Sequence, residues 1–353
     1  MKSAFVADLQ DGQAVATFFL VREKEIRTSA SSGKSWLHLS LGDRSGTIEA
    51  KMWDNFADLA QTFACEDIVR VRGRVKLYRG EKELTIDQIV IAAETDYALD
   101  DFLPHTKQDV EKLYAQLRET IAGVRNPWLQ KLLASFADDP EFAGKLKRAP
   151  AAMTMHHAYL GGLLEHIVSL CGLAKRVTEH YPEVDGDVLL AGIVLHDIGK
   201  TQELSYSRAI RYTTEGQLLG HIVIGLGMVR RKIDAIPDFP KPLAAIVEHL
   251  IVSHHGEYEY GSPKLPAMRE AVLLHYLDDL DSKMGAMRET LGETQSDEVW
   301  TGRNPALRRN LLNANAYLNP AEPKAKIAAP ARQAGGSGGL FGAAMPGTTR
   351  KNG

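Results

Sequence analysis

Residues 192–200 read GIVLHDIGK, where an apolar run ends in a histidine–aspartate pair, His196-Asp197, followed closely by Lys200. The surrounding chain, from about residue 97 to about residue 318, repeats apolar residues at intervals of three and four, which predicts helices. Other apolar segments of this region carry further residues of metal-ligand type: His166, His221, His254, His255 and Asp278. Several of these side chains are expected to point toward a shared interior. The pattern predicts an all-α domain with a polar cluster inside it.

This set of imidazole and carboxylate groups suits divalent ions such as Mn, Fe, Co, Ni or Zn. The adjacent ligands His196 and Asp197 can reach one ion together, and the carboxylate can bridge to a second. Two ions that share a carboxylate would hold a phosphate and supply a nucleophile at neutral pH. Taken alone, each histidine is more often a packed core or surface residue. Five ligand-bearing segments in one helical region favour the metal interpretation.

Residues 13 to about 92 have a different pattern, with short strands separated by turns. Alternation places one set of apolar residues on the inner face: Leu37, Leu39, Leu41, Ile48, Ala50, Met52, Val69, Val71 and Val75. It places Arg70, Arg72 and Arg74 on the outer face, where a solvated strand face is the simplest interpretation. Five strands with a short helical insert after the third predict a small closed barrel of the OB type.

These patterns predict a multidomain α and β protein. We expect an OB-type barrel over residues 1–96, a helical linker region that packs on the next domain over 97–150, and the helical domain itself over 151–318. Residues 319–353 are rich in Ala, Pro and Gly and contain few large apolar residues, which predicts a disordered tail.

Charge and cysteine content set the expected setting. The formal net charge of −3 provides no global attraction to nucleic acid, so any basic binding surface has to be local. The two cysteines, Cys65 and Cys171, fall in segments that read as different domains, which argues against a disulfide framework. The sequence shows no signal-peptide pattern and no apolar run of membrane-spanning length. We therefore expect a soluble, cytoplasmic protein.

The order H…HD…H…H…D, with HDIGK at its centre, resembles the HD superfamily of metal-dependent phosphohydrolases. Longer words, MHHAYLGGLLEHIVSL, HDIGKTQEL, YTTEGQLLGHI and SHHGEYEYGSP, resemble the YhaM-type 3′→5′ exoribonucleases, in which an OB fold precedes the HD domain. The resemblance covers about residues 10 to 315. The word SHHGEYEYGSP lacks the Gly-Tyr-Pro element of the HD-GYP branch, so hydrolysis of cyclic dinucleotides loses support.

The resemblance implies roles for individual residues. The metal set of the superfamily corresponds here to His166, His196, Asp197 and Asp278. The additional ligands of its two-metal members correspond to His221 and His254, with Asp197 bridging the ions and His255 as a less certain ligand. Lys200 corresponds to a lysine that meets the substrate phosphate, so Asp197 and Lys200 are the catalytic candidates; a solvated lysine at a helix end is the alternative. For His156, His157 and His275 we expect packing, surface or ligand-orienting roles, and for Asp279 and Asp281 solvent-facing positions or helix-surface pairs.

The outer face of the second and third strands, together with the neighbouring loops, is the expected binding surface of an OB barrel. Its candidate nucleic-acid-binding residues are Trp36, Trp53, Lys34, Lys51, Tyr78 and Arg79. The same face carries His38, and the first loop is expected to carry Arg22, Lys24 and Arg27 as well. Aromatic rings for stacking and cations for phosphates suit sequence-tolerant binding of single strands. The alternative is that a tryptophan covers the barrel against the helical domain.

The expected function is a metal-dependent 3′→5′ exoribonuclease that also acts on single-stranded DNA. Its expected cofactor is a pair of divalent ions, manganese first, with Fe, Co, Ni or Mg as alternatives. The expected partner is single-stranded RNA, and a homo-oligomer is left open. Two rival hypotheses stay open: an HD-type nucleotide phosphodiesterase or nucleotidase with a regulatory OB module, and a non-catalytic single-strand-binding protein.

Overall fold

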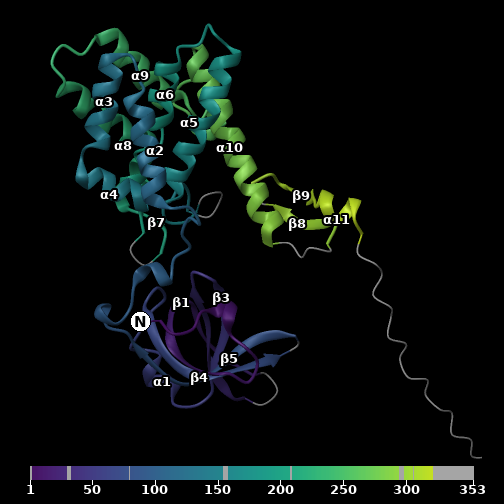
Figure 1. The fold of residues 1–353 in the computed structure, drawn as a ribbon. Helices are drawn as coiled ribbons and strands as arrows, with labels where there is room; N and C mark the ends of the chain where they lie inside the picture. Colours follow the sequence, from purple (N-terminus) through teal and green to yellow (C-terminus); the bar gives the residue numbers. More distant parts are fainter. Residues whose placement is uncertain are drawn as a thin grey trace, which may run out of the picture.

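A computed structural model describes residues 2–29, 33–78, 80–153, 158–206, 209–293, 298–304 and 306–320 (Figure 1). Five strands close into a barrel in the order β1-β2-β3-β5-β4, with β3 and β5 parallel and the other neighbours antiparallel. The strands are β1 (Ala14–Thr28), β2 (Ser35–Asp43), β3 (Gly46–Met52), β4 (Ile68–Tyr78) and β5 (Glu81–Ile91). Helix α1 (Phe56–Leu59) follows the third strand, as expected for an OB barrel.

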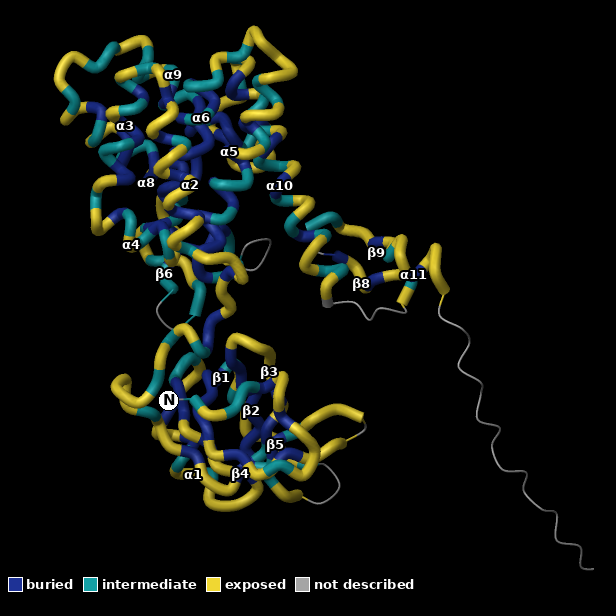
Figure 2. Tube along the Cα trace, in the orientation of Figure 1, coloured by how far each residue is buried: buried dark blue, intermediate teal, exposed yellow. Residues whose placement is uncertain are grey.

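The barrel interior is apolar because the strands alternate as the sequence predicts. Leu37, Leu39 and Leu41 are fully buried, and the inner residues of β3 and β4 join the same core. Figure 2 shows buried residues inside the barrel and among the helices, where the two larger cores lie. A smaller cluster consists of Phe18, Leu20, Ile68 and Phe102. Arg70, Arg72 and Arg74 are exposed on the outer face of β4.

Strand β1 extends to Thr28, so Arg22, Lys24 and Arg27 lie in a strand and not in the first loop, where the sequence predicted them. β1 pairs with β2 as far as Thr28 and Ser35, with an irregularity between Val21 and Glu23. The backbone pairing stabilises this polar segment, although its side chains carry no apolar pattern. Arg22 donates to the carbonyl oxygen of Phe102 at 3.2 Å.

Lys24 also points into the protein, where its Nζ donates to the carbonyl oxygens of Ala60 (2.8 Å) and Phe63 (2.5 Å). Arg27 forms an ion pair with Glu25 at 2.9 Å. Arg22, Lys24 and Arg27 are therefore not the free loop cations that the sequence predicts, because each already has a partner within the chain.

The second part of the chain is helical. Its helices are α2 (Val110–Ala122), α3 (Pro127–Ala137), α4 (Pro140–Arg148), α5 (Gly162–His180), α6 (Gly186–Leu195), α7 (Lys200–Glu203), α8 (Thr214–Asp234), α9 (Lys241–Ser253) and α10 (Arg269–Glu293). Side-chain oxygens of Asp109, Asn126, Asp139 and Asp185 cap the first turns of α2, α3, α4 and α6 by accepting backbone N–H groups. Residues of α2 to α6 and α8 to α10 share one hydrophobic core.

Two short sheets accompany the helices, and the sequence did not predict them. One joins β6 (Leu204–Ser205) to β7 (Arg211–Tyr212), and the other joins β8 (Trp300–Asn304) to β9 (Arg309–Leu312). Such short ladders contain too few residues to show alternation. Figure 1 shows α10 leading out of the helical domain to β8, β9 and α11 (Ala314–Leu318).

The remaining short elements are 3-10 turns at Val6–Asp8, Glu94–Asp96, Leu99–Asp101 and Tyr258–Tyr260. The predicted disordered tail lies outside the described residues, apart from Asn319 and Pro320. Within the part of the chain that the structure describes, no helix has both the length and the hydropathy to cross a membrane.

Candidate functional site

The His196-Asp197 pair stands at the end of α6, a helix that is apolar almost all round and lies in the core. His196 is fully buried, and its Nδ1 lies 2.9 Å from the carbonyl oxygen of Ile193, one turn earlier. A carbonyl oxygen can only accept, so Nδ1 carries the proton and Nε2 presents its lone pair. The helix end therefore aims a neutral imidazole and a buried carboxylate at the same interior space.

Gly199, in the same HDIGK word, allows a close approach between this turn and α8. A Cβ at this position would overlap the backbone carbonyl of His221. Because only glycine fits, the turn that carries Asp197 can lie directly against the segment that carries His221. The distance from Asp197 Oδ1 to His221 Nε2 is 3.4 Å.

His166 enters the site from α5 and is held by two carboxylates of α10. Its Nε2 lies 3.2 Å from Asp278 Oδ1, and its Nδ1 lies 2.8 Å from Asp281 Oδ2. Ser169 donates to the other Asp281 oxygen at 2.6 Å. Burial disfavours the charged form of His166, but these two carboxylates outweigh burial and raise the pKa of His166 to about 9. Without a cation at Nε2, the imidazole therefore takes up a proton between the two acids.

The expectation that Asp281 faces solvent is wrong. Asp281 is only 8% exposed and orients His166, whereas Asp279 does form a helix-surface pair, with Lys283 at 2.6 Å. The signal was present in the sequence, since Asp278 and Asp281 are three residues apart and share a helix face.

His221 lies where α8 is interrupted. Gly220 has a non-helical backbone (φ 72°), so His221 begins the second part of the helix and its backbone N–H needs an acceptor outside the helix. Glu203 Oε1 accepts this N–H at 2.9 Å and also lies 3.2 Å from His221 Nδ1. Burial would raise the pKa of Glu203, but the hydrogen bonds to His221 lower it. Sequence reasoning missed Glu203, because no spacing rule connects it with a histidine eighteen positions later.

His254 and His255 follow the end of α9. His254 is fully buried with its Nδ1 2.7 Å from the carbonyl oxygen of Ile251, and His255 Nδ1 lies 2.7 Å from the carbonyl oxygen of Tyr260. Both imidazoles therefore present Nε2 as the free acceptor. His275 Nδ1 lies 3.0 Å from the His254 carbonyl oxygen, so it acts on the backbone of this segment.

The next residue, Gly256, has φ +77°, and a Cβ there would overlap the His275 ring. Only glycine gives the chain this left-handed turn without strain and lets it pass so close to the ring. His275 therefore packs against Gly256 and supports the backbone at His254. His156 and His157 lie outside the described residues.

Asp197 stands between two groups of potential ligands. Among the described residues, His166, His196 and Asp197 bring ligand atoms within 4.8 Å of one another, and so do His221, His254 and His255. Asp197 Oδ2 lies 3.4 Å from His196 Nε2, whereas Asp197 Oδ1 lies 3.4 Å from His221 Nε2 and 3.7 Å from His254 Nε2. The two carboxylate oxygens therefore face different groups.

Buried polar atoms without partners test whether these residues suit a metal. In the described part of the chain, four such atoms belong to the centre: His196 Nε2, Asp197 Oδ1, His221 Nε2 and His254 Nε2. A buried acceptor without a donor costs about 1–3 kcal/mol. Four of them aimed at one interior space fit a divalent cation, which accepts imidazole and carboxylate lone pairs together.

The protonation states of Asp197 and His254 agree with this fit. Burial would raise the pKa of Asp197, but the charge of Lys200 lowers it well below the usual carboxyl value. Burial lowers the pKa of His254 well below the usual imidazole value. An anionic carboxylate and a neutral imidazole are the forms that bind metal.

Lys200 is the first residue of α7, and its Nζ donates to Asp197 Oδ2 at 2.6 Å. Burial would lower the pKa of Lys200, but Asp197 and Asp278 outweigh burial and raise it. The side chain is 16% exposed, so Lys200 is a charged group beside the centre rather than a solvated helix-end lysine.

On the barrel, Trp36 and Trp53 form one aromatic surface, with ring centroids 5.2 Å apart and planes inclined by 35°. Trp53 is 45% exposed, and Trp36 is partly buried. Lys51 forms an ion pair with Glu83 at 2.5 Å, and its Nζ also lies 5.3 Å from the ring of Tyr78.

The other predicted residues of this face are Lys34, Arg79 and His38. Lys34 is exposed near the start of β2, and Arg79 lies outside the described residues. His38 alternates with the inner residues Leu37 and Leu39, so it lies on the outer face of the barrel, but it is only 5% exposed and pairs with Glu49 at 2.9 Å.

Comparisons with known proteins divide the chain at the same place. A family model described as an OB-fold nucleic acid binding domain matches residues 20–92, and a model described as an HD domain matches residues 163–283. The second OB-fold domain of replication protein A from Methanococcus maripaludis is 22% identical, covering 27% of this chain and 97% of that chain with a TM-score of 0.22. Asparaginyl-tRNA synthetase from Pyrococcus horikoshii is 16% identical, covering 37% of this chain and 35% of that chain with a TM-score of 0.22. The chain thus consists of an OB-fold nucleic-acid-binding domain followed by an HD domain, whose histidine–aspartate centre suits divalent metal ions.

Proposed function

We propose that this chain is a metal-dependent 3′→5′ exonuclease that removes nucleotides from single-stranded nucleic acid, with RNA as principal substrate and single-stranded DNA as a second one. The observation that carries the proposal is the position of Asp197, which turns one oxygen to each of two histidine groups in a chain that also contains an OB fold. A pair of ions bridged by a carboxylate suits the hydrolysis of a phosphodiester.

The proposed metal ligands fall into two sets around Asp197. One set consists of His166, His196, Asp197 and Asp278, and the other of His221, His254, His255 and Asp197. When bound, two divalent ions, which we propose to be manganese, supply positive charge for the phosphate and a nucleophile at neutral pH. Asp281 and Glu203 hold His166 and His221 in the orientation and proton state that binding needs.

Lys200 has a separate role in this proposal. Asp197 holds its ammonium group in place at the edge of the centre. A preorganised cation beside a phosphate stabilises the negative charge that develops as the ester bond breaks. Lys200 is therefore assigned to the substrate phosphate and Asp197 to the metals.

The barrel provides the strand-binding surface. Trp36 and Trp53 offer their rings to bases, which every nucleotide can use because all bases have a stacking face. Lys34, Lys51, Tyr78 and Arg79 are assigned to the same surface. The 3′→5′ direction and the preference for RNA rest on the resemblance to the YhaM-type exoribonucleases.

The site of action is proposed to be the cytoplasm. Cys65 is exposed and Cys171 is buried, and both are free thiols. An exposed free thiol suits a reducing compartment.

The test is a time course on single-stranded RNA with a labelled 5′ end, with Mn²⁺ added or chelated. We expect a metal-dependent ladder that shortens from the 3′ end. Free nucleotides tested in parallel distinguish the nucleotidase alternative, which would release phosphate from them and leave the strand intact. A strand that stays intact with every divalent metal would overturn the proposed activity.

A further inference from the structure

Three arginines form a stripe along the outer face of β4. The tryptophans lie on other strands of the barrel, with Trp36 in β2 and Trp53 directly after β3. Arg70, Arg72 and Arg74 alternate with the buried Val69, Val71 and Gly73 and are all exposed. Same-face side chains of a strand are two residues apart, or about 7 Å at roughly 3.4 Å per residue. The stripe therefore repeats a positive charge at an interval close to that of successive phosphates along an extended nucleic-acid strand.

The residues paired with the three arginines on the neighbouring strands are all uncharged. On β1, Ala16 is paired with Arg72 and Ala14 with Arg74. On β5, Gln88 is paired with Arg72 and Thr85 with Arg74. Arg70 has larger apolar partners, Phe18 on β1 and Val90 on β5.

None of the three arginines forms an ion pair with a carboxylate among the residues that the structure describes. Arg74 Nη1 donates to the carbonyl oxygen of Gly12 at 2.8 Å, and the Arg70 guanidinium lies 5.9 Å from the ring of Phe18. Lys51, on the tryptophan face, differs because Glu83 neutralises it. The stripe keeps its full charge on a chain whose formal net charge is −3.

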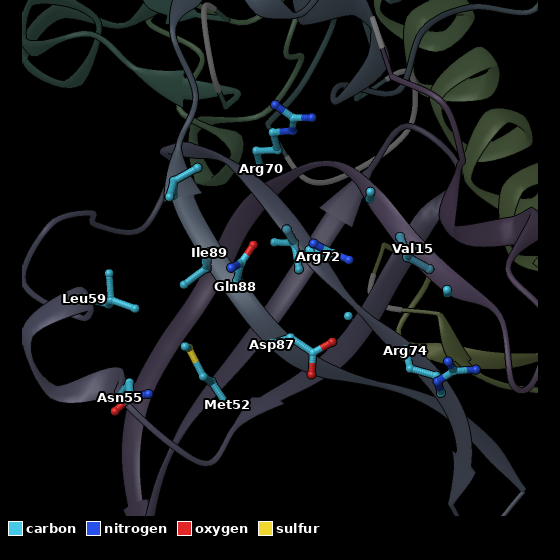
Figure 3. A pocket seen from close by; sticks show the side chains of 15 residues that line it. Val15, Met52, Asn55, Leu59, Arg70, Arg72, Arg74, Asp87, Gln88 and Ile89 are labelled. Carbon is cyan, nitrogen blue, oxygen red and sulfur yellow. The ribbon is translucent and has the colours of Figure 1, made fainter.

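The stripe borders a groove of about 1050 Å³ that is lined only by barrel residues. Figure 3 shows Arg70, Arg72 and Arg74 among the lining residues, with Gln88 and Asp87 on the neighbouring strand β5. Asp87 is the one carboxylate in this lining, so the lining side chains carry a net charge of +2 (three arginines minus one aspartate). Its lining contains no aromatic ring. The groove therefore suits phosphates and sugars rather than stacked bases.

The stripe also leads toward the tryptophan face. Continuing along β4, the same outer face carries Lys76 and then Tyr78, both exposed. Tyr78 lies beside Lys51 of β3. That strand ends at Met52, and Trp53 is the next residue. A single-stranded nucleic acid can therefore extend from the tryptophans, around the β4–β5 end of the barrel, onto the arginine stripe.

We propose that Arg70, Arg72 and Arg74 form a second nucleic-acid contact, which binds the sugar-phosphate backbone of a long single strand beyond the part held by the tryptophan face. This inference rests on the proposed single-strand function and adds a further site to it. The contact is independent of base sequence, because arginines aligned along one strand meet phosphates only. It increases affinity for long strands and leaves short ones unaffected.

The test compares oligouridines of about 4 to about 16 nucleotides, the range of site sizes for one OB fold. Binding is measured by fluorescence anisotropy in chelator, so that no strand is cut. The variant is Arg70→Gln, Arg72→Gln and Arg74→Gln combined. The matched control is Lys112→Gln, Lys175→Gln and Arg176→Gln, which removes the same charge from exposed positions on α2 and α5.

We expect the stripe variant to bind the longest strand about tenfold more weakly, and the shortest strand as the natural chain does. The slope of log K against log salt should decrease in magnitude by about 2, because three phosphate contacts at about 0.7 each are lost. The control should match the natural chain at every length.

Equal affinity of the stripe variant and the natural chain for the longest strand would overturn the inference. So would an equal loss in the control, which would show a general charge effect. The proposed exonuclease activity is tested separately by cleavage of the short strand with Mn²⁺, which the stripe variant should retain. If the natural chain did not cleave the short strand, the proposed activity would be refuted. The dependence of binding on strand length would still test whether the arginine stripe contacts nucleic acid.

Discussion

The barrel and the helical domain place their candidate functional residues in opposite ways. On the barrel, Trp53, Tyr78 and the arginine stripe stand on exposed strand faces, where side chains do not have to fit a core. In the helical domain, His196, Asp197 and His254 are buried at the ends of apolar helices, and each needs a partner for its second polar atom. We therefore expect the barrel to tolerate exchange of a single candidate binding residue, whereas the centre should depend on its connected set.

The largest effect should come from Asp197. Asp197→Asn keeps the size of the side chain but removes the charge that both histidine groups and Lys200 face. We expect turnover on single-stranded RNA to fall by more than about 100-fold, with loss of bound metal measured by elemental analysis. Asp279→Asn, at the surface pair with Lys283, is the control and should behave as the natural chain does. Full activity of the Asp197 variant would refute the metal centre.

On the barrel, Trp36→Ala combined with Trp53→Ala should weaken binding of short oligonucleotides by about 1–3 kcal/mol, the contribution of one stacked base. The two rings are in contact, so they are expected to hold one base rather than two. Cleavage of a small nitrophenyl phosphodiester should stay unchanged, because the centre lies in the other domain. Unchanged affinity for the oligonucleotide would show that the tryptophans only pack against each other.

The orienting carboxylates should have an intermediate effect. Asp281→Asn and Glu203→Gln each remove the charge behind one histidine and should lower metal affinity by roughly 10- to 100-fold. Competition with a metal-binding dye measures this affinity without any substrate. Ser169→Ala, which removes only the hydroxyl on Asp281, should have a smaller effect. If Asp281→Asn and Glu203→Gln bound metal as tightly as the natural chain, the two carboxylates would have no orienting role.

The smallest effect should be on the reactivity of the two cysteines. Cys65 lies in the barrel domain and Cys171 in α5 of the helical domain, so each reports on one domain. Exposed Cys65 should react with a thiol reagent at once, whereas buried Cys171 should react only as its core opens. Burial raises the pKa of Cys171 to about 12, so its reactive thiolate is scarce at neutral pH and increases only as pH approaches that value. Chelation of metal should accelerate the Cys171 reaction and leave that of Cys65 unchanged. Peptide mapping of the labelled protein over time distinguishes the two sites.

Much of the fold could be predicted because it depends on local periodicity. Alternation in β2, β3 and β4 identified the inner residues of the barrel, and three- and four-residue spacing identified the helical region. The extension of β1 to Thr28 was not predictable in this way, since its pairing with β2 stabilises a polar segment without an apolar pattern. The β6–β7 and β8–β9 sheets were missed for a similar reason, because their ladders are too short to show a period.

The sequence by itself determined the division into an OB barrel and an HD domain, and it supplied the residue types of the centre. Only the tertiary structure decided which atoms meet. Asp281 and Glu203 support His166 and His221, and the backbone carbonyls of Ile193 and Ile251 leave His196 and His254 with free Nε2 atoms. The physical reason is that a helix period determines the face on which a residue lies, whereas a hydrogen bond also needs two elements at one distance and one angle.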